Sequence, residues 1–255
     1  MNNNTIISLK NINFSYSRKS SKILENINLD INKNDFLAII GPNGGGKTTL
    51  LKIILGLLKP DSGAIEYSGF SNEGRNKIGY VPQFSNFDKD FPINVLDLVL
   101  MGRLNEKKGL LKHYDSKDRE LSLQNLDKLG IKNLAKNSIN ELSGGQLQRV
   151  LIARALTSEP EIMLMDEPSA SIDKSSEEKL TELLQELNKS IPIVIVTHDT
   201  TSIAPFVKQI ACVNKKLHYH SDGVISEESV NEIYNCPVEL IAHGVPHRVL
   251  GKHKH

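Results

Sequence analysis

Two segments near the amino terminus alternate apolar and polar residues, which is the pattern of strands with one buried face. The first covers residues 6–14 and contains a slip in the alternation near Asn11, and the second covers residues 22–31. Short apolar runs further along the chain predict more strands. These runs are residues 36–40, 78–83, 162–165 and 191–196.

Apolar residues at helical spacing predict the remaining regular elements. The segment 175–188 is amphipathic, with its four leucines on one side. Turn-forming residues at 59–63 end a predicted helix at 49–58, and further helices are predicted at 95–101, 116–129 and 146–156. Because strands and helices alternate, we expect an α/β fold with a mainly parallel sheet and helices on its faces.

The length of 255 residues favours a single domain with subdomains. A mostly helical stretch interrupts the alternation of strands and helices. We therefore expect a core of about residues 1–83 and 158–235, a helical subdomain of about 84–157, and a tail with histidines of about 236–255.

Charge and cysteine content narrow the possible partners. The 31 basic and 30 acidic residues leave a net charge of +1, which gives no global argument for binding nucleic acid or an anionic membrane. Cys212 and Cys236 are expected to be reduced thiols of a cytosolic protein. The first residues do not resemble a signal peptide, and no apolar run approaches the ~20 residues that span a bilayer. A membrane role would therefore come through a partner.

A glycine-rich segment between the strand 36–40 and the following helix fits the phosphate-loop pattern G-x-x-x-x-G-K-[ST]. The glycines let backbone N–H groups point at phosphate oxygens, and the helix adds its positive end. Lys47 can reach the β- and γ-phosphates, and the Thr48 hydroxyl can bind Mg²⁺. The sequence therefore predicts that ATP binds to Gly41, Pro42, Asn43, Gly44, Gly45, Gly46, Lys47, Thr48 and Thr49.

Two acidic residues end the apolar strand 162–165. Asp166 is expected to hold Mg²⁺ through water, and Glu167 lies where a base could orient the attacking water. Acid pairs at strand ends are common and often structural, but the position downstream of a complete phosphate loop favours catalysis.

The segment 142–150, Leu-Ser-Gly-Gly-Gln-Leu-Gln-Arg-Val, resembles the signature motif of the ATP-binding cassette (ABC) ATPases. It lies between the phosphate loop and Asp166-Glu167-Pro168, as in that family, and the resemblance covers nearly the whole chain. It implies a P-loop NTPase core, an antiparallel β subdomain and a helical signature subdomain. Four further positions match the adenine-stacking aromatic, the Q-loop glutamine, the D-loop aspartate at the dimer interface and the switch histidine: Tyr16, Gln83, Asp173 and His198.

Three of these residues also have simpler explanations. Tyr16 could only pack against its neighbours, His198 could be a satisfied structural group, and Asp173 could cap the next helix. Their places relative to the motifs favour the functional interpretation, and Asp173 could have both roles.

The resemblance implies that two copies pair head to tail and enclose two ATP molecules. Glu167 would polarise the water, His198 would contact the γ-phosphate, and Gln83 would couple the nucleotide to the helical subdomain and a membrane permease. Lys47 would complete the catalytic set of one copy. The other copy would contribute Ser143, Gly144, Gly145 and Gln146, and Mg²⁺ would be held through Thr48, Gln83 and Asp166.

A narrower resemblance links the chain to the ATPases of zinc and manganese uptake systems. Residues 91–103 look like the segment after the Q-loop in that group, and residues 236–240 and 243–250 look like its tail. Importers of iron-siderophores and cobalamin have a comparable segment after the Q-loop and remain an alternative. The resemblance implies a peripheral subunit at the cytoplasmic face of the cell membrane, working with permease subunits and an extracytoplasmic metal-binding protein.

Histidines are concentrated near the end of the chain. Four of the eight, His243, His247, His253 and His255, fall in the last 13 residues. Imidazole binds zinc, so this tail could sense metal. A solvated tail is the simpler interpretation, because the spacing matches no compact zinc site and two lysines flank His253.

Two other classes of protein carry related motifs. ABC proteins that act on ribosomes or DNA usually have two cassettes, a long coiled-coil insertion or zinc modules. This chain has one cassette and only about 60 residues between Gln83 and Ser143. P-loop kinases lack counterparts of residues 143–146 and His198. We therefore expect a transport ATPase with no nucleic-acid partner.

Overall fold

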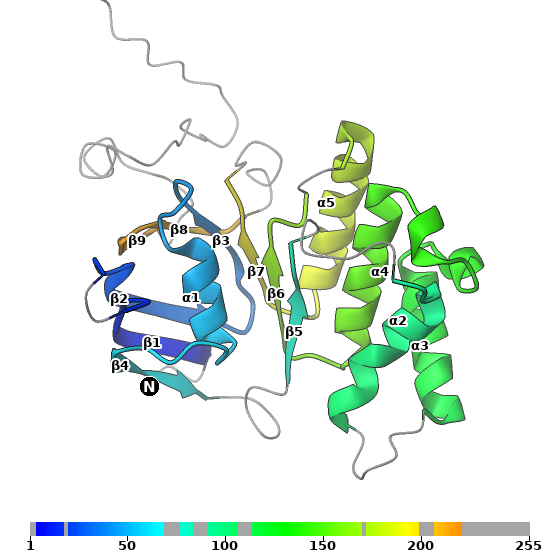
Figure 1. The fold of residues 1–255 in the computed structure, drawn as a ribbon, viewed down its shortest axis with the longest axis horizontal. Helices are drawn as coiled ribbons and strands as arrows, with labels where there is room; N and C mark the ends of the chain where they lie inside the picture. Colours follow the sequence, from blue (N-terminus) through cyan, green and yellow to red (C-terminus); the bar gives the residue numbers. More distant parts are fainter. Residues whose placement is uncertain are drawn as a thin grey trace, which may run out of the picture.

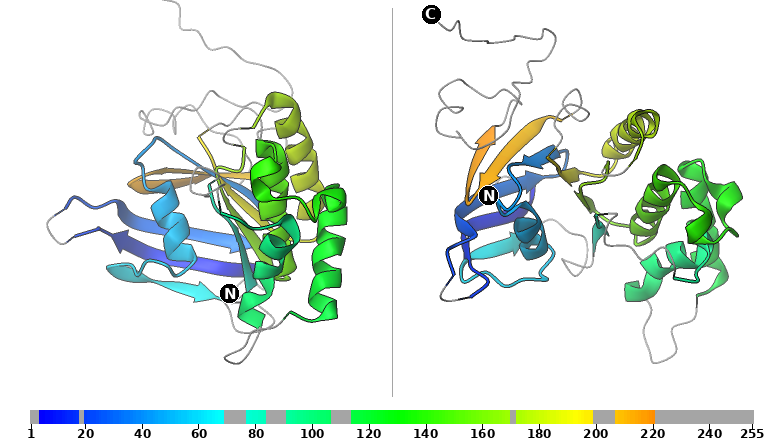
Figure 2. Two further views of the ribbon diagram at one scale, coloured as in Figure 1. Left: turned by 45° about the vertical axis from the view of Figure 1, so that its right-hand side comes forward. Right: turned by 45° about the horizontal axis from the view of Figure 1, so that its top comes forward.

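The computed structural model describes residues 4–17, 20–68, 77–83, 91–106, 114–169, 172–198 and 207–220. These residues form two sheets with helices packed between and beside them (Figures 1 and 2). Cys236 and the four histidines of the tail lie outside the described residues, so the expectations for them stay predictions. Within the described ranges, no helix combines the length and the apolar character needed to cross a membrane.

The central sheet has six strands in the order β5-β6-β7-β3-β8-β9. All neighbouring pairs are parallel except β8 and β9, which are antiparallel, so the predicted mainly parallel sheet is confirmed. The local pattern of residues did not predict β8. The strands are β3 Phe36–Ile40, β5 Ile78–Val81, β6 Ile162–Asp166, β7 Ile193–Val196, β8 Gln209–Asn214 and β9 Lys216–His220.

The second sheet is antiparallel, with the order β2-β1-β4. Its strands are β1 Thr5–Phe14, β2 Leu24–Asn32 and β4 Ser62–Tyr67. The predicted slip near Asn11 is a bulge, because this residue has a φ of 51° and the β1–β2 register shifts between Leu9 and Ile12. Strand β4 was not predicted, because it begins in a stretch that reads only as a turn. It forms by pairing with β1, where Gly63 approaches the Asn11 carbonyl too closely for a Cβ.

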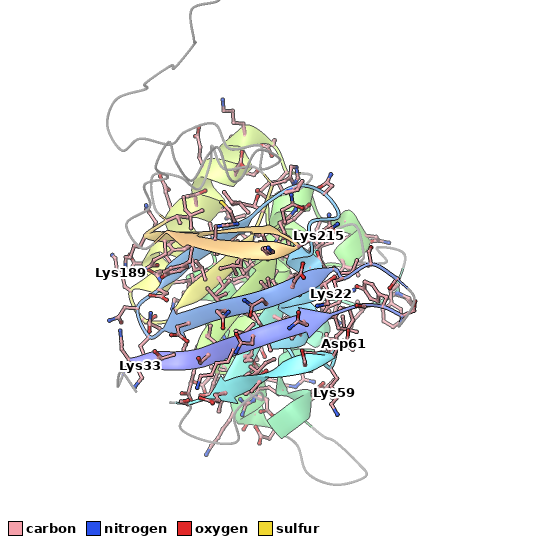
Figure 3. The ribbon with its side chains drawn as sticks, turned by 90° about the vertical axis from the view of Figure 1, so that its left-hand side faces the viewer. Lys22, Lys33, Lys59, Asp61, Lys189 and Lys215 are labelled. Atoms are coloured by element: carbon pink, nitrogen blue, oxygen red, sulfur yellow. The ribbon has the colours of Figure 1, made fainter. Side chains whose placement is uncertain are left out.

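Two hydrophobic clusters lie on opposite faces of the central sheet, and β3 contributes alternate residues to both. Leu37 and Ile39 pack with helix α1 (Lys47–Ile54) and the apolar face of the three-stranded sheet. Phe36, Ala38 and Ile40 pack with the other helices. Helix α1 is thus enclosed between two sheets, which fixes the phosphate loop before it. Figure 3 shows the outer face of the three-stranded sheet, with Lys22, Lys33 and Lys59 around its rim.

The other helices lie on the far side of the central sheet (Figure 2). They are α2 (Val95–Leu100), α3 (Ser116–Lys128), α4 (Gly144–Thr157), α5 (Lys174–Asn188) and the 3₁₀ segments η3 (Met101–Glu106), η4 (Lys132–Leu134) and η5 (Ile139–Glu141). The predicted leucine face of α5 packs into the core, although Leu183 is only partly buried. Helix α1 is shorter than predicted, because Gly56 with a φ of 72° lies directly after its carboxyl end.

Arg103 joins three segments on the helical side of the central sheet. Its Nε donates to Asp118 Oδ1 at 3.1 Å, and its Nη1 donates to Glu159 Oε2 at 2.7 Å and to the Thr157 carbonyl at 3.3 Å. Asp118 is only 3% exposed and belongs to the capping box that begins α3. The guanidinium therefore balances a carboxylate that is almost completely removed from water.

We expect Arg103→Gln to lower the free energy of unfolding by about 2–4 kcal/mol, because it takes a cation away from a buried carboxylate. Urea denaturation measures this change. Arg119→Gln, on the exposed side of α3, is the matched control and should change stability by less than about 0.5 kcal/mol. Equal effects of the two substitutions would contradict the role given to Arg103.

Candidate functional site

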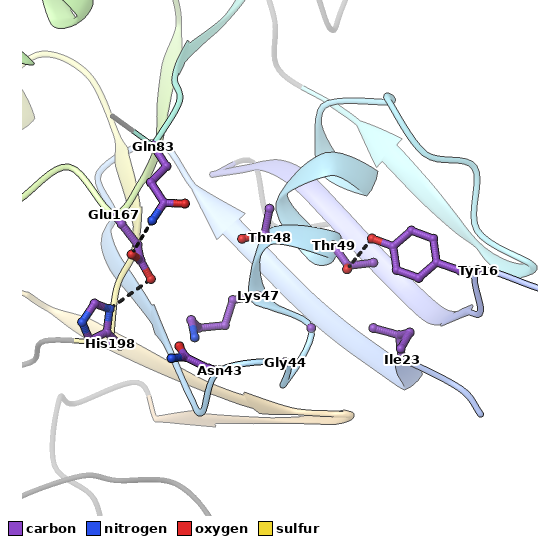
Figure 4. Close-up of a pocket in the computed structure, with 11 residues that line it drawn as sticks. Tyr16, Ile23, Asn43, Gly44, Lys47, Thr48, Thr49, Gln83, Glu167 and His198 are labelled. Carbon is purple, nitrogen blue, oxygen red and sulfur yellow. Dashed lines mark hydrogen bonds and ion pairs between the residues drawn. The ribbon is translucent and has the colours of Figure 1, made fainter. Parts of the chain in front are cut away.

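Three parallel strands end at one edge of the central sheet, and the residues after them line a pocket of about 460 Å³ (Figure 4). The phosphate loop follows β3, Glu167 follows β6, and His198 lies just after β7. Their ends lie together because β6 and β3 both pair in parallel with β7. The lining residues are Tyr16, Ile23, Asn43, Gly44, Gly46, Lys47, Thr48, Thr49, Gln83, Glu167 and His198.

The phosphate loop turns on glycines that approach other backbone atoms closely. Gly46 precedes α1 with a φ of 103°, a left-handed conformation that glycine adopts at little cost. A Cβ on Gly41 would lie 2.1 Å from the carbonyl oxygen of Val213. The backbone N–H of Lys215 donates to the Gly45 carbonyl at 3.1 Å. The backbone around the turn between β8 and β9 therefore packs against the phosphate loop and supports it.

Lys47 lies at the centre of the pocket, on the first turn of α1 (Figure 4). It is 6% exposed, and its Nζ donates to the carbonyl oxygens of Gly41 at 2.8 Å and Pro42 at 3.1 Å. Gly41 and Pro42, which were predicted to bind ATP, thus hold the lysine through their carbonyl oxygens and do not line the pocket themselves. A buried ammonium group beside the positive end of a helix attracts an anion such as a phosphate.

Glu167 is held at the other side of the pocket by two neighbours. Gln83 Nε2 donates to Glu167 Oε2 at 2.9 Å, and His198 Nδ1 lies 3.0 Å from Glu167 Oε1. Glu167 also has a φ of 48°, a left-handed conformation that is uncommon outside glycine and often found at functional sites. The structure therefore brings together three of the four residues predicted to take part in the chemical step, and Lys47 lines the same pocket.

Asp166 and Thr48 place oxygen atoms side by side near the pocket. Thr48 Oγ1 donates to Asp166 Oδ1 at 3.4 Å. Burial is the main cause that raises the pKa of Asp166, and the nearby charge of Glu167 raises it further. The Thr48 hydrogen bond and the charge of Lys47 act in the opposite direction. A cation beside Asp166 would favour its charged form. Carboxylate and hydroxyl oxygens suit Mg²⁺, so these residues fit a magnesium–nucleotide complex.

Tyr16 forms the end of the pocket opposite Glu167 (Figure 4). Its ring is held edge-on against Phe14, and its hydroxyl lies 3.1 Å from Thr49 Oγ1. The residue is nevertheless 61% exposed, so a face of the ring is open to a planar ligand. Ile23 adds an apolar surface beside it. This end suits a nucleotide base. Lys47 lies in a different part of the pocket, so the base and the phosphates would bind to different residues (Figure 4).

We expect Tyr16→Ala to weaken ATP binding about tenfold, because stacking of a base on an aromatic ring contributes about 1–3 kcal/mol. Equilibrium titration with a fluorescent ATP analogue measures the affinity. Tyr16→Phe keeps the ring and removes only the contact with Thr49, so its affinity should stay close to that of the wild type. A similar loss in both variants would mean that the hydroxyl, and not the ring, binds the nucleotide.

Residues 143–146 do not line this pocket in a single chain. Ser143 Oγ accepts from the Gln146 backbone N–H at 3.3 Å, and Gln146 Oε1 accepts from the Ser143 backbone N–H at 2.9 Å. This capping box begins α4, and Ser143 is exposed. The positive end of α4 is thus presented at the surface.

Asp173 lies outside the pocket as well and is exposed. It is the N-cap of α5, and hydrogen bonds from Ser176 lower its pKa. The capping interpretation of Asp173 is therefore confirmed. Its role at a dimer interface stays a prediction.

Three residues that shape the pocket were not predicted from the sequence. Ile23 lies at its aromatic end, and the backbones of Val213 and Lys215 support the phosphate loop. Of the three, only Ile23 carries a local signal, as an apolar residue near the start of the alternating segment 22–31. Val213 and Lys215, at the turn between β8 and β9, contact the loop through backbone atoms. A pattern of side chains along the sequence cannot predict such contacts.

Comparisons with known proteins give consistent matches. The family described as ABC transporter matches residues 24–170. The "Zinc uptake system ATP-binding protein ZurA" of Listeria innocua is 39% identical over 88% of this chain and 88% of its own length. The "Manganese transport system ATP-binding protein MntB" of Listeria monocytogenes is 38% identical over 92% of this chain and 98% of its own length.

Solved structures share the fold over most of the chain. A metal-chelate type ABC transporter in an inward-facing conformation has a TM-score of 0.79 and 33% identity, covering 91% of this chain and 89% of that one. The dimeric structure of MJ0796, a bacterial ABC transporter cassette, has a TM-score of 0.71 and 31% identity, covering 85% of this chain and 98% of the other.

Proposed function

Because this chain belongs to the ABC transporter family, we propose that it is the ATP-hydrolysing subunit of a membrane transporter that imports zinc or manganese. The family and the P-loop fold predicted from the motifs are confirmed. The observation that carries the proposal is the pocket where the phosphate loop, Glu167 and His198 meet. The choice of metal is supported by the names of relatives that match nearly the whole chain.

In the proposed reaction, the two ends of the pocket bind different parts of ATP. Tyr16 stacks on the base, while Lys47 and the backbone N–H groups before α1 bind the phosphates. Mg²⁺, held through Thr48, Asp166 and Gln83, would neutralise charge on the phosphate oxygens. Glu167 then orients the attacking water and accepts its proton, and His198 contacts the γ-phosphate.

Gln83 and His198 hold the carboxylate of Glu167 that is proposed to act as the base. Both of its carboxylate oxygens are engaged, one by Gln83 and one by His198. Each oxygen keeps a lone pair that can accept from a water, and Gln83 competes with that water for the same carboxylate. Gln83 is also the residue proposed to couple the nucleotide to the helical subdomain. Exchange of the Gln83 contact would therefore link the arrival of nucleotide and permease to catalysis.

A complete site requires a second copy of the chain. Residues 143–146 lie outside the pocket of their own chain and present the positive end of α4 at the surface. In a head-to-tail dimer this end would meet the γ-phosphate bound by the partner. MJ0796, which shares the fold, has been solved as a dimer.

The wider assembly belongs to the same proposal. The chain would bind permease subunits at the cytoplasmic face of the membrane, through the helical subdomain of about residues 84–157, and an extracytoplasmic protein would deliver the metal. The core of about residues 1–83 and 158–235 would bind and hydrolyse ATP. Import of a metal chelate, such as an iron-siderophore or cobalamin, is the second candidate, supported by the 33% identity to a metal-chelate type transporter.

Uptake of labelled zinc, manganese, ferric siderophore and cobalamin tests the proposal in cells that lack the gene. The wild-type chain should restore uptake of zinc or manganese, and Lys47→Ala should not. Restored uptake of only a chelate would favour the second candidate. Purification with ribosomes or DNA, and without a polytopic membrane protein, would contradict transport altogether.

A further inference from the structure

Helices α4 and α5 both lie beside the central sheet (Figure 1), and their first turns approach each other. Gly145, in the first turn of α4, lies so close to α5 that a Cβ on it would come within 3.0 Å of both Cβ and Oγ of Ser176. Glycine at this position therefore lets the two helix ends touch. Ser176 is partly exposed and does not line the pocket.

Ser176 is also tied to Asp173 by two hydrogen bonds. Its backbone N–H donates to Asp173 Oδ1 at 3.0 Å, and its hydroxyl donates to Asp173 Oδ2 at 2.6 Å. One serine thus contacts the α4 segment with its side chain and holds the turn before α5 with the same hydroxyl. This turn ends the connection that begins at Glu167, after strand β6.

We propose that Ser176 is a positioning residue that fixes residues 143–146 relative to Asp173, so that both reach the second copy of the chain as one rigid unit. The inference rests on the proposed dimeric ATPase. Neither segment lines the pocket of its own chain, and both Ser143 and Asp173 are exposed. If both segments contact the partner, their spacing decides whether they do so together, and Ser176 is the residue that touches both.

Substitutions at position 176 separate the hydroxyl from the packing against Gly145. Alanine at position 176 would keep the Cβ beside Gly145 but lose the bond to Asp173 Oδ2. Threonine would keep the hydroxyl. The neighbouring Ser175 is exposed and lies in the same helical turn, so it offers a control of equal chemistry.

The test compares Ser176→Ala, Ser176→Thr and Ser175→Ala in the full chain. We expect Ser176→Ala to lower kcat about tenfold. In the Glu167→Gln background it should raise the ATP concentration for half-maximal dimerisation about tenfold. ADP affinity of the monomer should stay within about twofold, and Tm within about 2 °C. Ser176→Thr should recover most of the activity, and Ser175→Ala should match the wild type.

Each other outcome decides against the inference in a distinct way. Equal activity of Ser176→Ala and the wild type would overturn the positioning role while leaving the ATPase intact. A fall in Tm and in ADP affinity together with kcat, or the same loss in Ser175→Ala, would show a general role in the helix instead. A wild-type chain that neither hydrolyses ATP nor dimerises with it would overturn the proposed function itself.

Discussion

Glu167→Gln should lower kcat for ATP hydrolysis about a thousandfold, within the range of general-base catalysis, while ATP affinity stays within about twofold. Glutamine has nearly the same shape, and its oxygen can still face His198. Its amide nitrogen would face Gln83, which can rotate its own amide group to offer an oxygen. The pocket therefore keeps its form and loses only the group that accepts the proton of the attacking water.

The same variant should accumulate as a dimer when ATP is present, because the bound nucleotide is no longer consumed. Size-exclusion chromatography with and without ATP measures the dimer, and phosphate release measures turnover. Glu178→Gln, on the exposed surface of α5, is the matched control and should behave as the wild type. Wild-type turnover in Glu167→Gln would contradict the assignment of the base.

Lys47→Ala should weaken ATP binding about a hundredfold, because a buried ammonium makes charge-assisted hydrogen bonds to phosphate worth about 1.5–3 kcal/mol each. Its Nζ is held by the Gly41 and Pro42 carbonyls within 3.1 Å. The cation is thus already desolvated and in place before a phosphate arrives. Isothermal titration at fixed magnesium and salt concentration measures the affinity.

Two comparisons show whether the loss comes from binding rather than from damage to the loop. Lys59→Ala removes an exposed lysine beyond α1 and should leave the affinity unchanged. Thermal denaturation of Lys47→Ala reports on the two carbonyl contacts, and a Tm close to that of the wild type would show an intact loop. Unchanged ATP affinity in Lys47→Ala would remove the lysine from the proposed site.

Together the two variants separate binding from the chemical step. Lys47 lies at the centre of the pocket, where the loop and the end of α1 meet the phosphates. Glu167 acts from the far side, held by residues that come after two other strands. Lys47→Ala should therefore lower the affinity for ATP, whereas Glu167→Gln should lower kcat with little effect on affinity.

Most elements of the fold could be predicted from local sequence, because their patterns are short and continuous. The apolar strand 36–40, the glycine loop and the helix after it are adjacent in the chain, so their order alone indicates a phosphate site. Even the bulge at Asn11 is visible as a break in the alternation. Strand β4 escaped prediction because its pairing with β1, and not its own composition, makes it a strand.

Local sequence predicts the phosphate loop, the acids at the end of β6 and, through its motifs, the family. How distant segments touch depends on the packed fold. It brings Gln83 and His198 to the two oxygens of Glu167, places the turn at Lys215 behind Gly45, and sets Gly145 against Ser176. Residue patterns indicate which face of an element is buried, whereas contacts between elements depend on the packing of the whole core.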